Sequence, residues 1–378
     1  MRVAIVTESF LPSVNGVTNS VLRILEHLHT QGHQALVIAP EAPGTPKEYA
    51  GHRVKTISAL SMQALIPTGI PMGIPQRKLE HLIDGFAPDV IHLASPFALG
   101  AYTARVAKRL NIPTLSVYQT DLAGFAKHYR MSAAHSAIRK VVSRIHSNTN
   151  RTLAPSRPAI AELSSLGVPH VHLWRRGVNA ELFSPGKRDE DLRKQWGAKS
   201  RTLVGYVGRL ANEKRVHDLR FLDQDPSIQL VITGDGPARE KLREQLPHAI
   251  FLGFHSGEEL ARVYASLDLF IHTGPNETFC QAVQEALASG VPCIVPKTGG
   301  PSDLVTHGHT GYVINTHRPD ELEAAVHHFM MRNDIHEMKA MARDSVESRS
   351  WAMVNNQLIR HYGELIETKA QSTKGDAA

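Results

Sequence analysis

The stretch that most constrains the fold of this chain is 267–302, where an apolar run is followed by a loop, a helical pattern and a second apolar run. The apolar run 267–272 ends in the loop 273–276, and a helical pattern then begins at Glu277 and ends at Gly290. This order predicts a strand, a loop, a helix and a further strand. In an α/β sheet, such a loop and the N-terminus of its helix lie at the carboxyl edge of the strands. Backbone N–H groups there favour an anion such as a phosphate.

The same alternation recurs along the whole chain. Apolar runs typical of buried parallel strands occur at 2–7, 35–39, 54–57, 89–93, 114–118, 151–156, 202–207, 229–233 and 249–252. At 378 residues the chain is long enough for two α/β domains, each with its own core. The predicted parts are an N-terminal domain over 1–170, a C-terminal domain over 171–350, a last helix over 351–368 and a disordered tail over 369–378.

Composition narrows the class of protein. Cys280 and Cys293 are the only cysteines, so no disulfide framework is expected, and a reducing cytosol fits. No apolar run reaches the ~18 residues that a membrane span needs, and the chain starts with a strand pattern, so we expect a soluble or peripheral protein. Residues 1–170 contain 17 Lys and Arg against 9 Asp and Glu, a balance of +8, and the remainder, with 25 against 27, balances at −2. The N-terminal half therefore favours an anionic partner.

In the N-terminal half, candidate functional residues follow two predicted strands. Gly16 stands between the first strand and the first helix, where a missing Cβ permits close approach to a phosphate, although a lone loop glycine equally fits a simple turn. Asp121 follows the strand 114–118 and fits either a functional carboxylate or the N-cap of the next segment. A basic amphipathic pattern runs from Arg130 to His146; such patterns are usually the solvated face of a helix.

In the C-terminal half, two cations follow a glycine-ended strand. Gly208 is followed by Arg209, and Lys214 comes five residues later. Arginine offers a bidentate fork and lysine a point charge, so the pair suits a diphosphate, although such pairs are also common on plain surfaces. Glu277 and Glu285 are eight residues apart, about 12 Å along a helix. They are too far apart to share a proton or a metal, but they can hold hydroxyls at two ends of a long polar ligand; the alternative is two ordinary solvated glutamates.

Several of these features occur in the order found in a known enzyme family. The string Pro275-Asn-Glu-Thr-Phe-Cys-Gln-Ala-Val-Gln-Glu285-Ala resembles the signature of family 4 retaining glycosyltransferases. The similarity covers nearly the whole chain, and Lys214, in its Glu-Lys pair, lies 63 residues before Glu277, as the family's order requires. The resemblance implies a GT-B fold, in which two Rossmann-like domains face each other across a cleft and a C-terminal helix crosses back to the N-terminal domain.

The resemblance also assigns roles to single residues. It implies that Arg209 and Lys214 stabilise the donor diphosphate, together with backbone N–H groups near Phe279 and Cys280. It further implies that the turn at Gly253 holds the edge of the nucleobase.

Within the signature string, the resemblance implies that Glu277 holds hydroxyls of the transferred sugar and Glu285 the ribose. Thr278 belongs to the same donor-binding stretch. The loop of Gly16 is implied to meet the donor phosphates and the acceptor.

The chain departs from the family at two places. Many members have a pair of glycines where this chain has an asparagine and Gly16. Members often carry a histidine in the turn after the fifth strand, where this chain has Gln119. A catalytic histidine is therefore not carried over, and Asp121 becomes the candidate catalytic residue of that turn.

The implied activity is the retaining transfer of a hexose from a nucleoside diphosphate, with no metal or other cofactor. Resemblance to actinobacterial lipid mannosyltransferases favours GDP-mannose as the donor and a membrane glycolipid, acidic or mannosylated, as the acceptor. We therefore expect a peripheral protein at the cytoplasmic face of the plasma membrane. The basic pattern 130–146 and the apolar, proline-broken stretch 62–74 would hold it on anionic lipid. No nucleic-acid partner is expected.

Other interpretations stay open. The main alternative is a UDP-hexose donor, with either a lipid acceptor, as in sulfoquinovosyl- or glucosyl-type diacylglycerol synthesis, or a soluble acceptor. A non-catalytic nucleotide-sugar-binding protein is less favoured, because both cations and both glutamates are retained together. A nicotinamide-dependent oxidoreductase is disfavoured because no Gly-x-Gly-x-x-Gly follows the first strand. We interpret the Asp-x-Asp strings at 189–191 and 223–225 as surface or turn acids rather than as a metal site.

Overall fold

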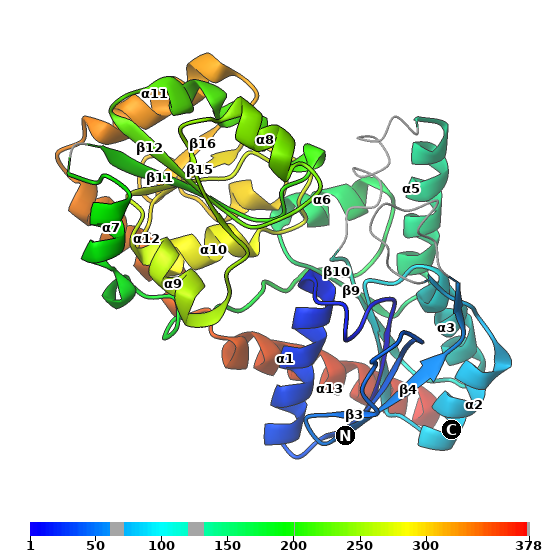
Figure 1. Cartoon of the computed structure of the whole chain (residues 1–378). Helices are drawn as coiled ribbons and strands as arrows, with labels where there is room; N and C mark the ends of the chain where they lie inside the picture. The colour runs from blue at the N-terminus through cyan, green and yellow to red at the C-terminus, as the bar shows by residue number, and fades with distance from the viewer. Residues whose placement is uncertain (61–71, 120–131, 200, 376–378) are drawn as a thin grey trace. The chain divides into compact units, whose positions relative to one another are not determined.

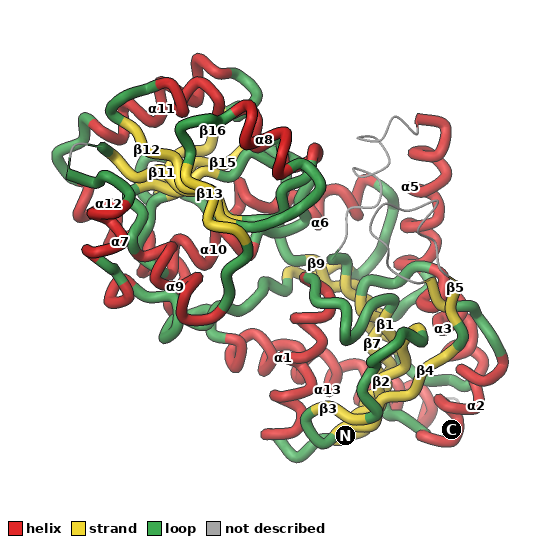
Figure 2. Tube along the Cα trace, viewed as in Figure 1, coloured by secondary structure: helices red, strands yellow, loops and turns green. Residues whose placement is uncertain are grey.

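The computed structural model forms two compact units, each a mostly parallel sheet with helices packed against it (Figures 1 and 2). The structure describes residues 1–60, 72–119, 132–199 and 201–375. The first unit comprises Met1–Arg175 and Ala352–Ala378, and the second comprises Arg176–Trp351. The α/β class predicted from the sequence is confirmed.

The sheet of the first unit has eight strands in the order β10-β9-β8-β7-β1-β2-β4-β3. Every neighbouring pair is parallel except β4 and β3. Its strands are β1 (Arg2–Thr7), β2 (Gln34–Pro40), β3 (Glu48–Tyr49), β4 (His52–Ile57), β7 (Val90–Ala94), β8 (Thr114–Val117), β9 (Arg151–Ala154) and β10 (Val171–Leu173). Strand β1 lies between β2 and β7, and its residues 3–7 are all buried, which explains its almost unbroken apolar sequence.

Helices and one small strand pair complete the first unit. The helices are α1 (Gly16–Thr30), α2 (Arg77–Phe86), α3 (Ala98–Arg109), α5 (Ser132–Ser147), α6 (Arg157–Ser165) and α13 (Trp351–Gly375). Strands β5 (Ala59–Leu60) and β6 (Met72–Gly73) form a separate antiparallel pair.

The last helix, α13, packs into the core of the first unit, as the resemblance implied. Val354, Leu358 and Tyr362 share one apolar cluster with residues of β1 and α1, and α13 lies beside α1 in Figure 1. The Tyr362 hydroxyl lies 2.6 Å from Nδ1 of His92 on β7. The predicted disordered tail from Lys369 is wrong as far as Gly375, because the helix continues through it. Residues 369–374 contain neither proline nor glycine, so nothing in their sequence ends the helix before Gly375.

The segment 168–185, which spans the predicted boundary between the two domains, begins as part of the first sheet. Strand β10 pairs in parallel with β9. The Trp174 N–H then donates to the Ala154 carbonyl at 2.8 Å, and the Trp174 indole donates to the Val354 carbonyl at 2.9 Å. The first unit therefore extends to Arg175.

The sheet of the second unit has six parallel strands in the order β13-β12-β11-β14-β15-β16. Its strands are β11 (Thr202–Val207), β12 (Ile228–Thr233), β13 (Ile250–Gly253), β14 (Leu269–Ile271), β15 (Cys293–Pro296) and β16 (Gly311–Ile314). Its helices are α7 (Glu190–Gln195), α8 (Arg239–Gln245), α9 (Gly257–Ala265), α10 (Gln281–Ala288), α11 (Pro319–Met330) and α12 (Ile335–Glu347). Two apolar clusters contain alternate residues of its central strands, so both faces of the sheet are covered.

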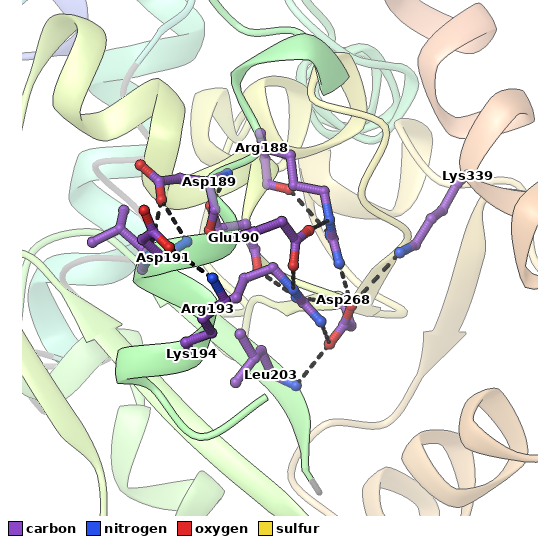
Figure 3. Close-up of polar contacts among 12 residues, drawn as sticks. Arg188, Asp189, Glu190, Asp191, Arg193, Lys194, Leu203, Asp268 and Lys339 are labelled. Carbon is purple, nitrogen blue, oxygen red and sulfur yellow. Dashed lines mark hydrogen bonds and ion pairs between the residues drawn. The ribbon is translucent and has the colours of Figure 1, made fainter. Parts of the chain in front are cut away.

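Charged side chains that converge on Asp268 hold the amino edge of this second sheet (Figure 3). Asp268 precedes β14, and it accepts a hydrogen bond from the N–H of Leu203 on β11 at 3.0 Å. Arg193 on α7 pairs with the same carboxylate at 3.0 Å, and Arg188 and Lys339 each approach it at 3.7 Å. This network ties α7 and α12 to the edge opposite the predicted donor site.

The two Asp-x-Asp strings serve local structure. The Asp189 carboxylate is the N-cap of α7 and accepts hydrogen bonds from the N–H groups of Asp191 and Leu192 at 2.9 Å each. Asp225 accepts a turn hydrogen bond from the N–H of Ser227 at 2.8 Å. Asp223, by contrast, is buried rather than a surface acid.

Within the described residues, no helix combines the length and the apolar character that crossing a membrane requires.

Candidate active site

Three loops meet through their backbones at the carboxyl edge of the second sheet. Gly208, Gly234 and Gly253 lie at the ends of β11, β12 and β13. The Gly234 N–H donates to the Gly253 carbonyl at 2.8 Å, and a Cβ on Gly234 would lie 2.0 Å from the Gly208 carbonyl oxygen. Gly234 also has φ +129°, which side chains disfavour. The sequence therefore needs glycine there to bring the loop of Gly208 and the predicted base-binding turn together.

The predicted base-binding turn presents an aromatic ring and a cation. Gly253 has φ +79°, and the next residue, Phe254, is 77% exposed. The Arg239 guanidinium lies 4.0 Å from the position that a Cβ on Gly253 would take.

Lys214 and Glu277, which are 63 residues apart in the sequence, form an ion pair. Lys214 Nζ donates to Glu277 Oε1 at 2.5 Å. The Thr273 hydroxyl donates to the Lys214 carbonyl at 2.6 Å, which fixes the backbone of the lysine against the loop after β14. Burial lowers the pKa of Lys214, but the neighbouring carboxylate more than offsets this, so that the pKa is raised and the lysine is charged.

Arg209 follows β11 at the same edge of the sheet and has a carboxylate partner of its own. Its guanidinium donates to Glu213, a buried residue four positions later. The hydroxyl of the buried Tyr206 donates to the Arg209 carbonyl at 3.3 Å and so fixes the backbone of the arginine. Burial raises the pKa of Tyr206, and the negative charges of Glu277 and Glu213 raise it further, whereas the positive charge of Arg209 lowers it.

The helix that the sequence predicted to open at Glu277 instead begins at Gln281, with Cys280 as its N-cap residue. The cause is a hydrogen bond from the Gly300 N–H to the Glu277 carbonyl at 2.7 Å. That carbonyl would otherwise accept the first helical N–H, from Gln281. Glu277, Thr278 and Phe279 therefore form a loop before α10 and lie against Gly300, where a Cβ would stand 2.3 Å from the Thr278 carbonyl oxygen. Glu277 therefore does not lie on the same helix as Glu285, and the spacing predicted for the two along one helix is wrong.

Glu285 lies on α10, in the second turn of the helix. Burial raises the pKa of Glu285 to about 7, whereas hydrogen bonds with Tyr264 and Gln281 and the charge of Arg176 lower it. Glu285 therefore titrates near neutral pH.

Arg176 is a residue near the site that the sequence analysis did not single out. Arg176 is 9% exposed, and its guanidinium stacks 5.9 Å from the Trp351 ring centroid. Burial lowers its pKa to about 10, whereas the negative charges of Glu285 and Glu277 raise it, so the arginine interacts electrostatically with both predicted carboxylates. The sequence pattern that could have indicated this residue is the Arg-Arg-Gly-Val-Asn string that begins at 175, because two adjacent cations suit a pair of buried carboxylates.

His272 is a second residue that the sequence did not single out. It directly follows β14, and its ring stacks on that of Tyr206 with an interplanar angle of 9°. Nε2 of His272 lies 3.6 Å from Glu277 Oε1. Burial lowers the pKa of His272 to about 4, so the imidazole is neutral.

In the first unit, Gly16 is the first residue of α1. The Asn15 side chain caps this helix by accepting the N–H groups of Val17 and Thr18 at 3.0 Å each. The N-terminus of α1 thus follows the carboxyl end of β1, where an anion is favoured. The predicted catalytic residue Asp121 lies outside the described residues.

Comparison with known proteins identifies the family. Two family models match the chain, "Glycosyltransferase Family 4" over residues 14–182 and "Glycosyl transferases group 1" over residues 188–345. A GDP-mannose-dependent alpha-mannosyltransferase of Corynebacterium glutamicum is 46% identical over 373 residues, which cover 97% of this chain and 89% of that relative. The chain belongs to glycosyltransferase family 4. It is a glycosyltransferase.

Two further similarities extend the comparison of this glycosyltransferase. A GDP-mannose-dependent alpha-(1-6)-phosphatidylinositol dimannoside mannosyltransferase of Mycobacterium tuberculosis is 25% identical, and the match covers 100% of both chains. The solved structure of HepE from Anabaena in complex with UDP matches with a TM-score of 0.78 at 19% identity, covering 96% of this chain and 100% of that one. The predicted GT-B fold is thereby confirmed.

Proposed function

We propose that this glycosyltransferase transfers mannose from GDP-mannose to a lipid acceptor at a membrane surface, with retention of configuration. The observation that carries the proposal is the Lys214–Glu277 pair beside Arg209 at the carboxyl edge of the second sheet. The 46% identical relative that is named for GDP-mannose supports the donor.

In the proposed reaction, the bond between the sugar C1 and the diphosphate oxygen breaks, and a bond from C1 to the acceptor oxygen forms on the same face. Negative charge develops on the leaving diphosphate while C1 becomes oxocarbenium-like. Arg209, Lys214 and backbone N–H groups at the start of α10, near Cys280, would stabilise that charge. The departing phosphate takes the acceptor proton, so the step needs no general base.

The two carboxylates would orient the donor. Glu277 would accept hydrogen bonds from sugar hydroxyls, and Glu285 from the ribose. An incoming diphosphate would compete with Glu277 for Lys214 and so free the carboxylate for the sugar. Arg176, which interacts electrostatically with both glutamates, would supply a compensating positive charge.

The donor can be tested by thermal shift of the full-length protein with GDP and with UDP. We expect GDP to raise the unfolding midpoint more, because a ligand that binds only the folded state stabilises it more strongly the lower its Kd at a given concentration. A clear preference for UDP would overturn the choice of GDP-mannose. Turnover should also survive EDTA, because two cations and a helix N-terminus would hold the diphosphate.

The lipid acceptor is supported by the basic face of α5 in the first unit. Lys140 and Arg144 are exposed, Arg139 is half-buried, and Val141 between them is 43% exposed. Basic residues near an anionic leaflet contribute about 1 kcal/mol each at low salt. The relative named for phosphatidylinositol dimannoside adds support. Arg130 and the apolar residues 61–71 lie outside the described part of the chain.

Vesicle sedimentation tests the membrane part of this proposal. Binding should require anionic lipid, weaken as salt rises, and drop when Arg139, Lys140 and Arg144 are all changed to Ser. A control with the same change in charge replaces three exposed basic residues of the second unit, Arg220, Lys241 and Arg243. A protein that ignores anionic vesicles at low salt yet glycosylates a water-soluble acceptor would favour the soluble-acceptor alternative.

A further inference from the structure

Three different metal-ligating side chains converge beside the Lys214–Glu277 pair. One ligand atom each of His272, Glu277 and Cys280 lies within 4.8 Å of the other two. His272 follows β14, Glu277 lies in the next loop, and Cys280 precedes α10. The residues come from one loop whose backbone is fixed at both ends, by the sheet and by the helix.

His272 has unused ligating capacity. The residue is 3% exposed, and neither ring nitrogen makes a hydrogen bond of good geometry to any residue that the structure describes, although the ring interacts with the backbone of Gly274. A buried polar atom without a partner is costly, so such an atom usually has a role or an unseen ligand. Cys280 is 6% exposed and carries a free thiol.

We propose that His272, Glu277 and Cys280 form a binding site for a borderline-soft divalent cation such as Zn²⁺, and that this cation inhibits the enzyme. Nitrogen, sulfur and carboxylate oxygen are the ligands that zinc binds in tetrahedral sites, whereas Mg²⁺ and Mn²⁺ favour oxygen. Three protein ligands leave a fourth position for water. The inhibitory part rests on the proposed function, in which Glu277 holds the donor sugar.

The geometry requires only a small adjustment. Metal–ligand distances of about 2.0–2.3 Å place tetrahedral ligands roughly 3.3–3.8 Å apart, so the 4.8 Å spread must contract by about 1 Å. The Glu277 side chain is 24% exposed, so it can supply most of that movement once its carboxylate leaves Lys214.

Lys214 sets the strength of the site. Its ammonium lies 2.5 Å from Glu277 Oε1, so a cation must compete with it for the carboxylate. This competition suits a reversible, inhibitory site rather than a structural one. A cation bound there would occupy Glu277 and place positive charge where the proposed sugar lies, so that metal and donor exclude each other.

Titration of metal-free, reduced full-length protein with Co²⁺ tests the site without an activity assay. We expect one equivalent to bind, with tetrahedral d–d bands and a thiolate charge-transfer band. Zn²⁺ should displace the Co²⁺, and Mg²⁺ should not. Cys280→Ser should abolish the charge-transfer band, His272→Asn should weaken binding by more than about 10-fold, and the matched control Cys293→Ser should leave both unchanged.

Absence of saturable Co²⁺ binding to the folded wild-type protein would overturn the proposal, whatever the variants do. A charge-transfer band that survives in Cys280→Ser would overturn it as well.

Inhibition kinetics separate this inference from the proposed function. We expect Zn²⁺ to inhibit turnover competitively with the nucleotide sugar, EDTA to reverse the inhibition, and GDP-mannose to weaken Co²⁺ binding. Binding of Co²⁺ with the expected spectrum but without competition would support the metal site and contradict the role of Glu277 in donor binding.

Discussion

At the scale of single residues, the Lys214–Glu277 pair is the most sensitive point of the site. Glu277→Gln removes the carboxylate that would accept sugar hydroxyls, and Lys214→Met removes a charge that would stabilise the leaving diphosphate. We expect each change to lower kcat by about 10²–10³-fold, as the loss of one preorganised electrostatic group commonly does. Glu258→Gln on α9, whose side chain is 66% exposed, is the control and should leave the rate unchanged. Near-wild-type turnover in both site variants would contradict the assignment.

Glu285 makes a second prediction, about pH. Its pKa of about 7 in the folded protein lies above the ordinary 4.5, so the folded state holds this proton more tightly than the unfolded state does. The resulting stabilisation is complete below pH 4.5 and is lost as the pH rises through about 7. Glu285→Gln has no such group. As the pH rises from about 5 to about 8, the thermal midpoint of the wild type should therefore fall relative to that of the variant.

A second carboxyl group whose pKa is raised, that of Glu8, does not disturb this comparison of wild type and variant. Burial also raises the pKa of Glu8 in the first unit to about 7, against hydrogen bonds from the N–H groups at the start of α3. That slope is common to both proteins and cancels in the difference. Equal pH dependence of the two thermal midpoints would contradict the buried position of Glu285.

Which site residues could be predicted depended on what each one contacts. The position of Arg209, Lys214 and Glu277 at the carboxyl edge of the second sheet was predictable because these residues follow strand ends in order; their roles stay a prediction. Arg176 and His272 were not predictable, because their partners lie far away in the sequence and only burial reveals their importance. No local pattern in the sequence reports that burial.

At the scale of elements, the start of α10 decides where the site residues lie. Strand and helix types followed from periodicity, but the helix start did not, because a hydrogen bond from Gly300 removes the carbonyl that would begin the helix at Glu277. Gly300 comes 23 residues later in the sequence. The end of α13 was mispredicted for a simpler reason, since its polar last turns extend a helix that packing has already formed.

Gly300→Ala tests this element directly. A Cβ at Gly300 would stand 2.3 Å from the Thr278 carbonyl oxygen, so the loop of Glu277 must move. We expect weaker donor binding, seen as a higher KM, and a lower thermal midpoint. Gly363→Ala in α13 is the matched control: a Cβ there meets nothing within 4 Å, and alanine should stabilise the helix by about 0.5–1 kcal/mol. Unchanged KM in Gly300→Ala would contradict the account of the loop.

At the scale of the whole molecule, the two units carry different parts of the proposed function. The second unit holds the candidate donor-binding residues Arg209, Lys214, Glu277 and Glu285. The first unit holds the basic face of α5 and the helix N-terminus at Gly16. The sequence predicted this division through the β/α alternation and the uneven charge. The donor base and the acceptor could not be predicted from residues alone, because the motifs at Gly208 and Gly253 suit the phosphates and the edge of any nucleobase.

The most direct test of the central claim is the transfer reaction itself. Full-length protein would be incubated in EDTA with anionic glycolipid vesicles and either GDP-mannose or UDP-glucose, and the anomeric configuration of any glycolipid product determined by NMR. We predict mannosyl transfer from GDP-mannose with an α-linked product, lost in Glu277→Gln. Transfer from UDP-glucose alone, or a β-linked product, would contradict it.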